Sequence, residues 1–197
     1  MTIDPTDILA ALRIATADRH AELDQGMPLA RPAVTLADYR EHLALLRSWL
    51  APIEAWEAGF TDGPQDPALL AADPHLPSID ADLADLPPAA APLAQAAAWQ
   101  GSGASAYRWG VAYVIEGSRL GGAVLHRRLH AQLAPHPLRY LHANGVPPGP
   151  RWQQFMRLLR ANVQDEAAIA QACQGACDAF DSLLDLRRAA APERAAA

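Results

Sequence analysis

The sequence predicts an all-α protein that folds as one domain. Apolar residues recur at intervals of three and four along several long segments, which is the period of an amphipathic helix. No segment keeps the two-residue alternation that is typical of a β-strand. The 197 residues suffice for a single hydrophobic core. We therefore expect one domain over residues 1–187, followed by a disordered Ala-rich tail over residues 188–197.

Charge and composition exclude several classes of function. The formal net charge of −6 gives no broad attraction to nucleic-acid phosphates or anionic lipids, so neither partner is expected. No charge-free apolar run is long enough to span a bilayer, and the first fifteen residues lack the apolar core of a signal peptide. These features favour a cytoplasmic location. Cys173 and Cys177 are the only cysteines, and we expect reduced core residues rather than a disulfide framework.

The first predicted helix begins near Asp4-Pro5 and ends at Gly26. We expect Asp4 as the N-cap, Pro5 as the first helical residue and Asp7 as an acid in the first turn. Gly26 and Pro28 end the helix. One face of this helix carries five residues at helical spacing: Leu9, Leu12, Thr16, His20 and Leu23.

The remaining segments follow from similar signals. Thr35 and Asp38 form a capping box at the start of a second helix, in which Pro52 favours a bend. Residues 59–92 are rich in proline and predict an irregular connection with short helical pieces around residues 68–72 and 79–83. A loop is expected over 144–150. Four further helical segments are expected at residues 89–100, 105–133, 151–162 and 165–187.

The predicted helix over residues 105–133 contains an unusual number of glycines. Gly117, Gly121 and Gly122 together forfeit roughly 3 kcal/mol relative to alanine unless the missing side chains are needed. Gly117 and Gly121 lie four residues apart on one face, where they permit a kink and the close approach of another group. That group is either a flat ligand or another helix, and the spacing alone leaves both interpretations open.

His20 stands alone on the apolar face of the first predicted helix, with Asp24 one turn later. A lone histidine in such a place is more often a hydrogen-bonded core residue than a metal ligand. However, a ligating imidazole commonly donates its second ring nitrogen to a carboxylate, a role that Asp24 suits. His126 and His130 also share a helix face, but no third ligand is evident near them, so surface positions are favoured.

Two separated motifs resemble the haem oxygenase family. The run from Leu12 to His20, with Asp24 following, resembles the first-helix motif of the family. The run from Tyr113 to Gly122 resembles its distal-helix motif, particularly in the bacterial branch. Similarity extends to residues 155–162 and to the last long helix, so the resemblance covers most of the chain. It implies a multi-helix fold in which haem lies between the first helix and a glycine-kinked distal helix.

The resemblance also implies roles for individual residues. His20 is expected to bind the haem iron as its metal ligand, with Asp24 as the partner of the imidazole. Arg13, Tyr113 and Arg160 are expected to hold haem propionates, although a solvated arginine or a packed tyrosine remains the alternative for each. The catalytic residues on the other face of the haem are expected to be Gly117, Ser118, Gly121 and Gly122.

This chain departs from the mammalian members of the family at Ser118, where those proteins carry an aspartate. The water network that delivers protons must therefore differ in this chain, and the sequence assigns no residue to it.

The activity implied by the resemblance is the cleavage of haem to biliverdin, carbon monoxide and ferrous iron. Haem is then both substrate and cofactor, and dioxygen and an external electron donor such as a ferredoxin or a reductase are required. One use of the products is the supply of a chromophore, for which a photoreceptor that accepts biliverdin would be a partner. The other use is iron acquisition. Two alternatives stay open: a non-enzymatic haem or tetrapyrrole carrier on the same fold, and a helical interaction protein without haem.

Overall fold

The computed structural model describes residues 7–88 and 97–190. The helices are α1 Ile8–Gly26, α2 Leu36–Glu57, α3 Leu76–Asp85, α4 Ser105–Leu129, α5 Pro148–Asn162 and α6 Glu166–Ala190. Three short 3-10 helices lie in the connections: η1 Pro28–Ala30, η2 Gly63–Gln65 and η3 Ala143–Gly145. No strand occurs among the described residues, and the predicted all-α class is confirmed.

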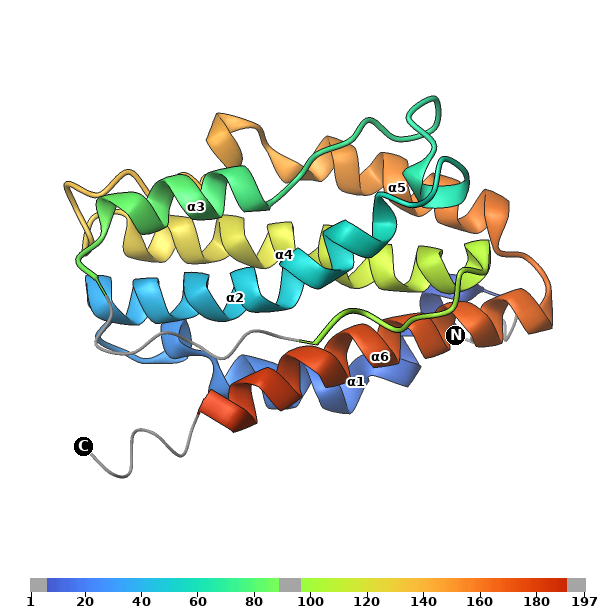
Figure 1. Ribbon diagram of the computed structural model, residues 1–197, viewed down its shortest axis with the longest axis horizontal. Helices are drawn as coiled ribbons and strands as arrows, with labels where there is room; N and C mark the ends of the chain where they lie inside the picture. Colours follow the sequence, from blue (N-terminus) through green and yellow to red (C-terminus); the bar gives the residue numbers. More distant parts are fainter. Residues whose placement is uncertain (1–6, 89–96, 191–197) are drawn as a thin grey trace.

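The helices lie in three layers (Figure 1). α1 and α6 form one outer layer, α2 and α4 the middle layer, and α3 and α5 the other outer layer. α4 makes its most extensive contacts with α6 and also packs on α5, while α2 contacts both α3 and α6. The core between the layers contains large buried side chains, among them Trp49, Trp109 and Phe155. None of the helices in the described part of the chain is long and apolar enough to cross a membrane.

Two glycines allow α4 and α6 to approach each other closely. A Cβ atom added at Gly110 of α4 would lie 1.8 Å from the carbonyl oxygen of Ala172 in α6. A Cβ atom added at Gly175 of α6 would lie 2.2 Å from the carbonyl oxygen of Tyr107 in α4. Because backbone atoms occupy the space of both missing side chains, these glycines serve helix packing.

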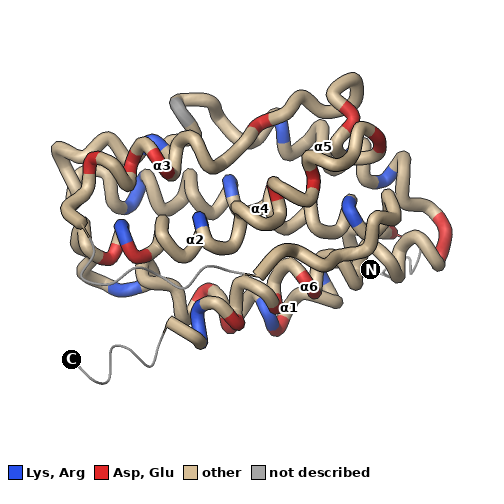
Figure 2. The backbone as a smooth tube through the Cα atoms, viewed as in Figure 1, with Lys and Arg blue, Asp and Glu red and all other residues tan. Residues whose placement is uncertain are grey.

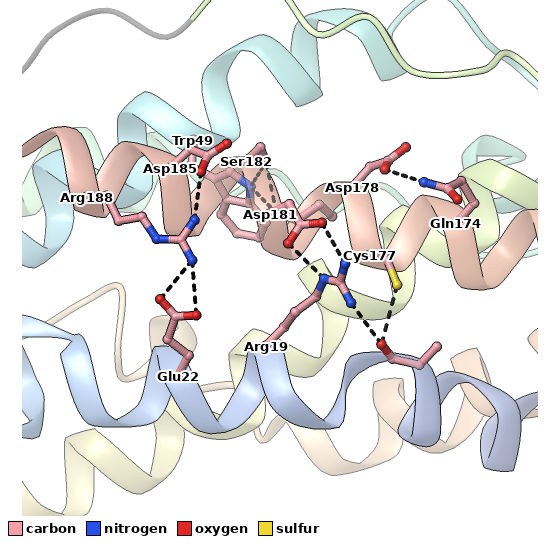
Figure 3. A network of polar contacts seen from close by, with 12 residues as sticks. Arg19, Glu22, Trp49, Gln174, Cys177, Asp178, Asp181, Ser182, Asp185 and Arg188 are labelled. Atoms are coloured by element: carbon pink, nitrogen blue, oxygen red, sulfur yellow. Dashed lines mark hydrogen bonds and ion pairs between the residues drawn. The ribbon is translucent and has the colours of Figure 1, made fainter.

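Ion pairs fix α1 against α6 (Figure 3). The Arg19 guanidinium donates two hydrogen bonds, of 2.8 and 2.9 Å, to the carboxylate of Asp181. One turn later, Glu22 accepts hydrogen bonds from both Arg187 and Arg188. In Figure 2, where the backbone is coloured by residue type, acidic and basic positions both occur along these two helices. The bidentate Arg19–Asp181 pair fixes the rotation of α1 next to His20, because such pairs have a fixed geometry.

The start of α1 differs from the prediction. The helix begins at Ile8, and Asp7 is its N-cap, because the Asp7 carboxylate accepts a hydrogen bond of 3.1 Å from the backbone N–H of Leu9. Asp7 is therefore not a first-turn acid, and Asp4-Pro5 lies outside the described residues. The predicted end at Gly26 is confirmed.

α2 begins as predicted. Thr35 and Asp38 form the expected capping box, and α2 continues through Pro52 to Glu57.

The prediction was wrong at two helix starts that contain prolines. Pro77 lies in the first turn of α3 and does not break it, and Pro148 and Pro150 lie in the first turn of α5, where a loop was expected. A proline fits the first turn because its missing N–H has no partner there anyway. The expected helical piece around residues 68–72 is a turn at 68–69 followed by irregular chain.

The other boundaries differ by a few residues. Residues 97–100 are not helical, and the rest of that predicted helix, 89–96, lies outside the described residues. α4 ends at Leu129 and runs as one helix through its glycines, so the expected kink does not interrupt it. α6 continues to Ala190, beyond the predicted domain end at residue 187, and 191–197 lie outside the described residues.

Candidate functional site

Most of the predicted site residues line one cavity of about 390 Å³, which we call the glycine cavity. Its walls come from α1, α2, α4, α5 and α6 and from the segment that follows α4. This volume lies within the range of small-molecule sites. The predicted residues in its lining are His20, Asp24, Tyr113, Gly117, Ser118, Gly121 and Gly122.

His20 and Asp24 form the pair that their spacing suggested. The Nδ1 atom of His20 lies 3.0 Å from Oδ2 of Asp24, and both side chains are largely exposed. In the neutral imidazole, a hydrogen bond to this carboxylate places the proton on Nδ1 and leaves the lone pair on Nε2. Phe180 of α6 packs against the imidazole, with 5.9 Å between the ring centroids. His20 is therefore an exposed side chain in the cavity lining and not a buried core histidine.

The glycines of the distal motif leave space in the cavity instead of packing against a helix. A Cβ atom added at Gly121 would meet no atom within 4 Å. At Gly117 and Gly122 it would make only ordinary contacts, of 3.7 Å with Trp152 and 3.9 Å with Leu141. At Gly110 on the same helix, in contrast, backbone atoms of Ala172 occupy the space of the missing side chain. Close helix packing therefore does not account for Gly117, Gly121 and Gly122, and the space beside them belongs to the glycine cavity.

A neighbouring recess continues the glycine cavity along α1. It shares Thr16, His20, Asp24 and Tyr113 with that cavity and adds Arg13 at its edge. Burial raises the pKa of Tyr113, while the charge of Arg13 and a hydrogen bond from its guanidinium lower it. The structure thus brings Arg13 and Tyr113 together, with one positive charge beside an otherwise apolar pocket.

Arg160 does not reach the site. Its side chain is 54% exposed, and its guanidinium lies 3.4 Å from the carboxylate of Asp7 at the start of α1. It lines neither the glycine cavity nor the recess. The expectation that Arg160 holds a propionate is not supported, because the packing of α5 turns this residue toward the N-terminus of α1.

His42 is a cavity residue to which the sequence analysis assigned no role. It lies on α2, is only 5% exposed, and its Nδ1 atom has no hydrogen-bond partner. Burial lowers the pKa of His42 to about 4, so the ring is neutral at physiological pH. A signal was present in the sequence, since His42 lies between Tyr39 and Leu46 on the apolar face of α2. A buried imidazole with a free ring nitrogen provides an unused polar contact in the lining.

His126 and His130 face a third ring that the sequence did not suggest. The ring of His142 stacks on that of His126, with 4.6 Å between centroids, and the ring of His130 also stacks on His126, at 5.6 Å. Within the described part of the chain, no group of three or more His, Cys, Asp or Glu side chains is arranged to hold a metal ion.

A second cavity of about 390 Å³, the glutamate cavity, lies beneath the connection between α2 and α3. Glu54, Glu57 and Glu116 line it together with His75 and Arg151. The Arg151 guanidinium pairs with the Glu116 carboxylate at 2.6 Å. The exposed segment 71–74 also lines this cavity, so it opens toward solvent. No residue of this cavity was predicted, because its acidic groups come from separate segments.

Replacement of Glu57 by glutamine should stabilise the protein at alkaline pH. Burial, reinforced by the charge of Glu54, raises the pKa of Glu57 from 4.5 to about 7. The folded state therefore holds this proton more tightly than the unfolded state, and stability is lost as pH rises from 4.5 through 7. We expect Glu57→Gln to raise the free energy of unfolding at pH 8 by at most about 3 kcal/mol.

The same Glu57→Gln variant should show no gain at pH 4, where the glutamate is protonated in both states. Urea unfolding at the two pH values measures the difference. The exposed carboxylate of Asp185 provides the control, since Asp185→Asn should change stability little at either pH. An equal gain from Glu57→Gln at pH 4 and pH 8 would contradict the titration argument.

Comparison with known proteins agrees with the geometry of the glycine cavity. The family model described as "Heme oxygenase" matches residues 6–189. A protein of Xanthomonas campestris pv. campestris (strain 8004) named "Heme oxygenase" is 43% identical over 74 residues, which are 36% of this chain and 44% of that protein. The chain thus matches less than half the length of this curated relative. Because the family model covers nearly the whole chain, the protein belongs to the heme oxygenase family.

Proposed function

We propose that this protein is an oxygenase that cleaves haem to biliverdin, carbon monoxide and ferrous iron, with dioxygen and electrons from an external donor. One observation carries the proposal. The His20–Asp24 pair and the open glycine face of α4 line the same cavity. A metal-binding nitrogen on one helix and a bare backbone on another are what a flat metal complex needs on its two faces.

The residues of the glycine cavity fit haem. The Nε2 atom of His20 would bind the haem iron, and the Asp24 carboxylate would hold the ring in the required tautomer. The space beside Gly121 is what a flat ligand would fill. The unpartnered Nδ1 atom of His42 offers a hydrogen bond to a group inside the cavity. Most of the other lining residues are apolar, as in typical cofactor sites.

Each residue has a defined task in this proposal. His20 holds the iron, and Asp24 increases the basicity of the imidazole. Arg13 and Tyr113 at the edge of the cavity bind a propionate through charge-assisted hydrogen bonds. The small residues Gly117, Ser118, Gly121 and Gly122 leave room for dioxygen. The bound haem itself supplies the dioxygen chemistry and is opened by it.

Membership of the heme oxygenase family and the name of the Xanthomonas relative support this activity. The products, the ferredoxin or reductase as electron donor, a biliverdin-accepting photoreceptor and the cytoplasmic location stay predictions. Arg160 is not part of the proposed propionate site.

Absorption spectroscopy of the purified protein tests the proposal. Added haemin should produce the Soret band of a histidine-ligated haem. A reductant in air should then replace this band by the broad bands of biliverdin, with carbon monoxide released. A Soret band that persists under reductant and air would make the protein a haem carrier. If haemin does not bind at all, the site assignment is wrong.

A further inference from the structure

Two side chains connect the glycine cavity with the glutamate cavity. Tyr140, which follows α4, lines the glycine cavity, and His75, which precedes α3, lines the glutamate cavity. The Tyr140 hydroxyl lies 3.4 Å from Nδ1 of His75, and their ring centroids are 5.9 Å apart. A tyrosine and a histidine are thus in polar contact across the wall that separates the two cavities.

The polar contact continues to the distal motif on α4. Ser118 lowers the pKa of Tyr140 by hydrogen bonding, and both residues line the glycine cavity, where Ser118 follows Gly117. The Ser118 hydroxyl also lies 2.7 Å from the carbonyl oxygen of Ile115. Because a hydroxyl rotates and can both donate and accept, Ser118 can pass a hydrogen bond onward into the cavity. Ser118, Tyr140 and His75 therefore form a continuous chain.

Backbone hydrogen bonds hold both members of the wall in place. The backbone N–H of Tyr140 donates to the carboxylate of Asp82 at 2.9 Å, and Asp82 is fully buried. The backbone N–H of His75 donates to the carboxylate of Glu54 at 2.9 Å, and His75 is only 3% exposed. Because these anchors do not involve the Tyr140 hydroxyl or the His75 ring, removing a polar side-chain atom leaves both positions supported.

Neither side chain retains a charge at neutral pH. Burial, together with the charges of Arg119 and Arg151, lowers the pKa of His75 to about 3. Burial raises the pKa of Tyr140 to about 12, although Arg119 and the hydrogen bond with Ser118 act against this rise. A proton therefore does not stay on His75, and a neutral hydroxyl is available on Tyr140 to donate.

We propose that His75 and Tyr140 pass protons from the glutamate cavity to Ser118 and into the glycine cavity. His75 takes a proton at Nε2 from water and gives its Nδ1 proton to the Tyr140 oxygen. Tyr140 gives its own hydroxyl proton to the Ser118 oxygen, and Ser118 gives its proton to an acceptor in the glycine cavity. One proton therefore enters at Nε2 and one leaves at Ser118. The imidazole returns to its first tautomer when Nε2 releases a proton to water and Nδ1 takes one from water. This inference rests on the proposed function, because reduction of dioxygen in the glycine cavity consumes protons.

The glutamate cavity is suited to supply these protons. It opens toward solvent along the exposed segment 71–74. Glu57 in its wall has a pKa near 7, so this carboxyl exchanges protons readily at neutral pH. The glycine cavity, in contrast, is walled mainly by apolar side chains, and the described His42 ring in it is neutral and buried. The chain through Tyr140 thus joins a cavity that contains three glutamates to one that is walled mainly by apolar side chains.

Two variants and one matched control test the relay. Tyr140→Phe removes the hydroxyl and His75→Phe removes the ring nitrogens, and both keep an aromatic ring in the wall. Tyr107→Phe is the control, because it removes a hydroxyl bonded to Asp178 in the contact between α4 and α6, away from both cavities. We expect Tyr140→Phe and His75→Phe to bind haemin like the wild type. Both should slow ring opening at least about 10-fold, as loss of proton transfer does.

A haem-free measurement tests the geometry separately. In the apoprotein, the ¹⁵N chemical shift of His75 Nδ1 should be that of a hydrogen-bonded nitrogen and should change in Tyr140→Phe but not in Tyr107→Phe. In the haem-loaded protein, the double variant should be no slower than either single variant, because the two residues act in one chain. The solvent deuterium isotope effect on ring opening should rise in both single variants.

The outcomes separate the relay from the proposed function. If the wild type opens haem and both variants do so as fast as Tyr107→Phe, the relay is wrong and the proposed function stands. If the variants lose haemin binding or their rate losses multiply in the double variant, the residues have structural roles and the relay is also wrong. If the wild type binds haemin without opening it, the proposed function fails, and the relay loses its purpose even where the ¹⁵N shift confirms the hydrogen bond.

Discussion

Replacing His20 by alanine is expected to abolish haem degradation. The variant loses the nitrogen that the Asp24 carboxylate leaves free for iron, so no axial ligand remains on α1 at this position. The Soret band of added haemin should shift strongly, and biliverdin formation should fall to the level of free haem. Asp24→Asn should have a smaller effect, with a loss of about 10- to 100-fold in activity or iron affinity, because it removes only the partner of the ligand.

Two comparisons make the His20→Ala result specific. Added imidazole should restore a histidine-like Soret band, because the exposed side of α1 leaves the vacated position accessible. His130→Ala, a change of an exposed histidine at the end of α4, should retain the wild-type spectrum and rate. An unchanged haem spectrum and rate in His20→Ala would show that another residue binds the iron. His42 would then be the first to examine, since it is a cavity histidine with a free ring nitrogen.

The predicted parts of the site depend on positions within a single helix. Residues four apart lie on the same face of a helix, so the sequence alone places His20 beside Asp24 and Gly117 beside Gly121. Apolar periodicity also identified α1, α2, α4, α5 and α6. Because both motifs lie on long helices, small errors at the helix ends did not affect them. The sequence leaves open whether the glycines of α4 face a cavity or pack against a helix, because this depends on which atoms lie opposite α4.

The residues that sequence reasoning missed or misplaced depend on tertiary packing. Arg160 lies on a correctly predicted helix, yet its direction follows from how α5 packs, and it meets Asp7 instead of the cavity. Tyr140 and His75 lie 65 residues apart in irregular segments, so no periodicity relates them. The glutamate cavity likewise draws its carboxylates from separate segments. Such constellations exist only once the three layers are assembled.

Alanine substitutions at two glycines of α4 should change stability in opposite directions. In Gly121→Ala the added Cβ meets no atom within 4 Å, so the haem-free protein should gain up to about 1 kcal/mol from the higher helix propensity of alanine. In Gly110→Ala the Cβ would lie 1.8 Å from the Ala172 carbonyl oxygen. Backbone atoms cannot rotate away, so α4 and α6 must separate, and we expect a loss of about 3 kcal/mol or more.

The opposite order is expected for haem. Gly121→Ala places a methyl group in the space proposed for haem and dioxygen, so haemin affinity and ring opening should fall although the apoprotein is more stable. Gly110→Ala lies outside the cavity lining, so its folded fraction should bind haemin with near wild-type affinity. Thermal unfolding without haemin and titration with haemin separate the two effects. If Gly121→Ala instead destabilised the apoprotein and left haemin binding unchanged, Gly121 would serve helix packing, as Gly110 does. The main observation that marks the cavity as a ligand site would then be lost.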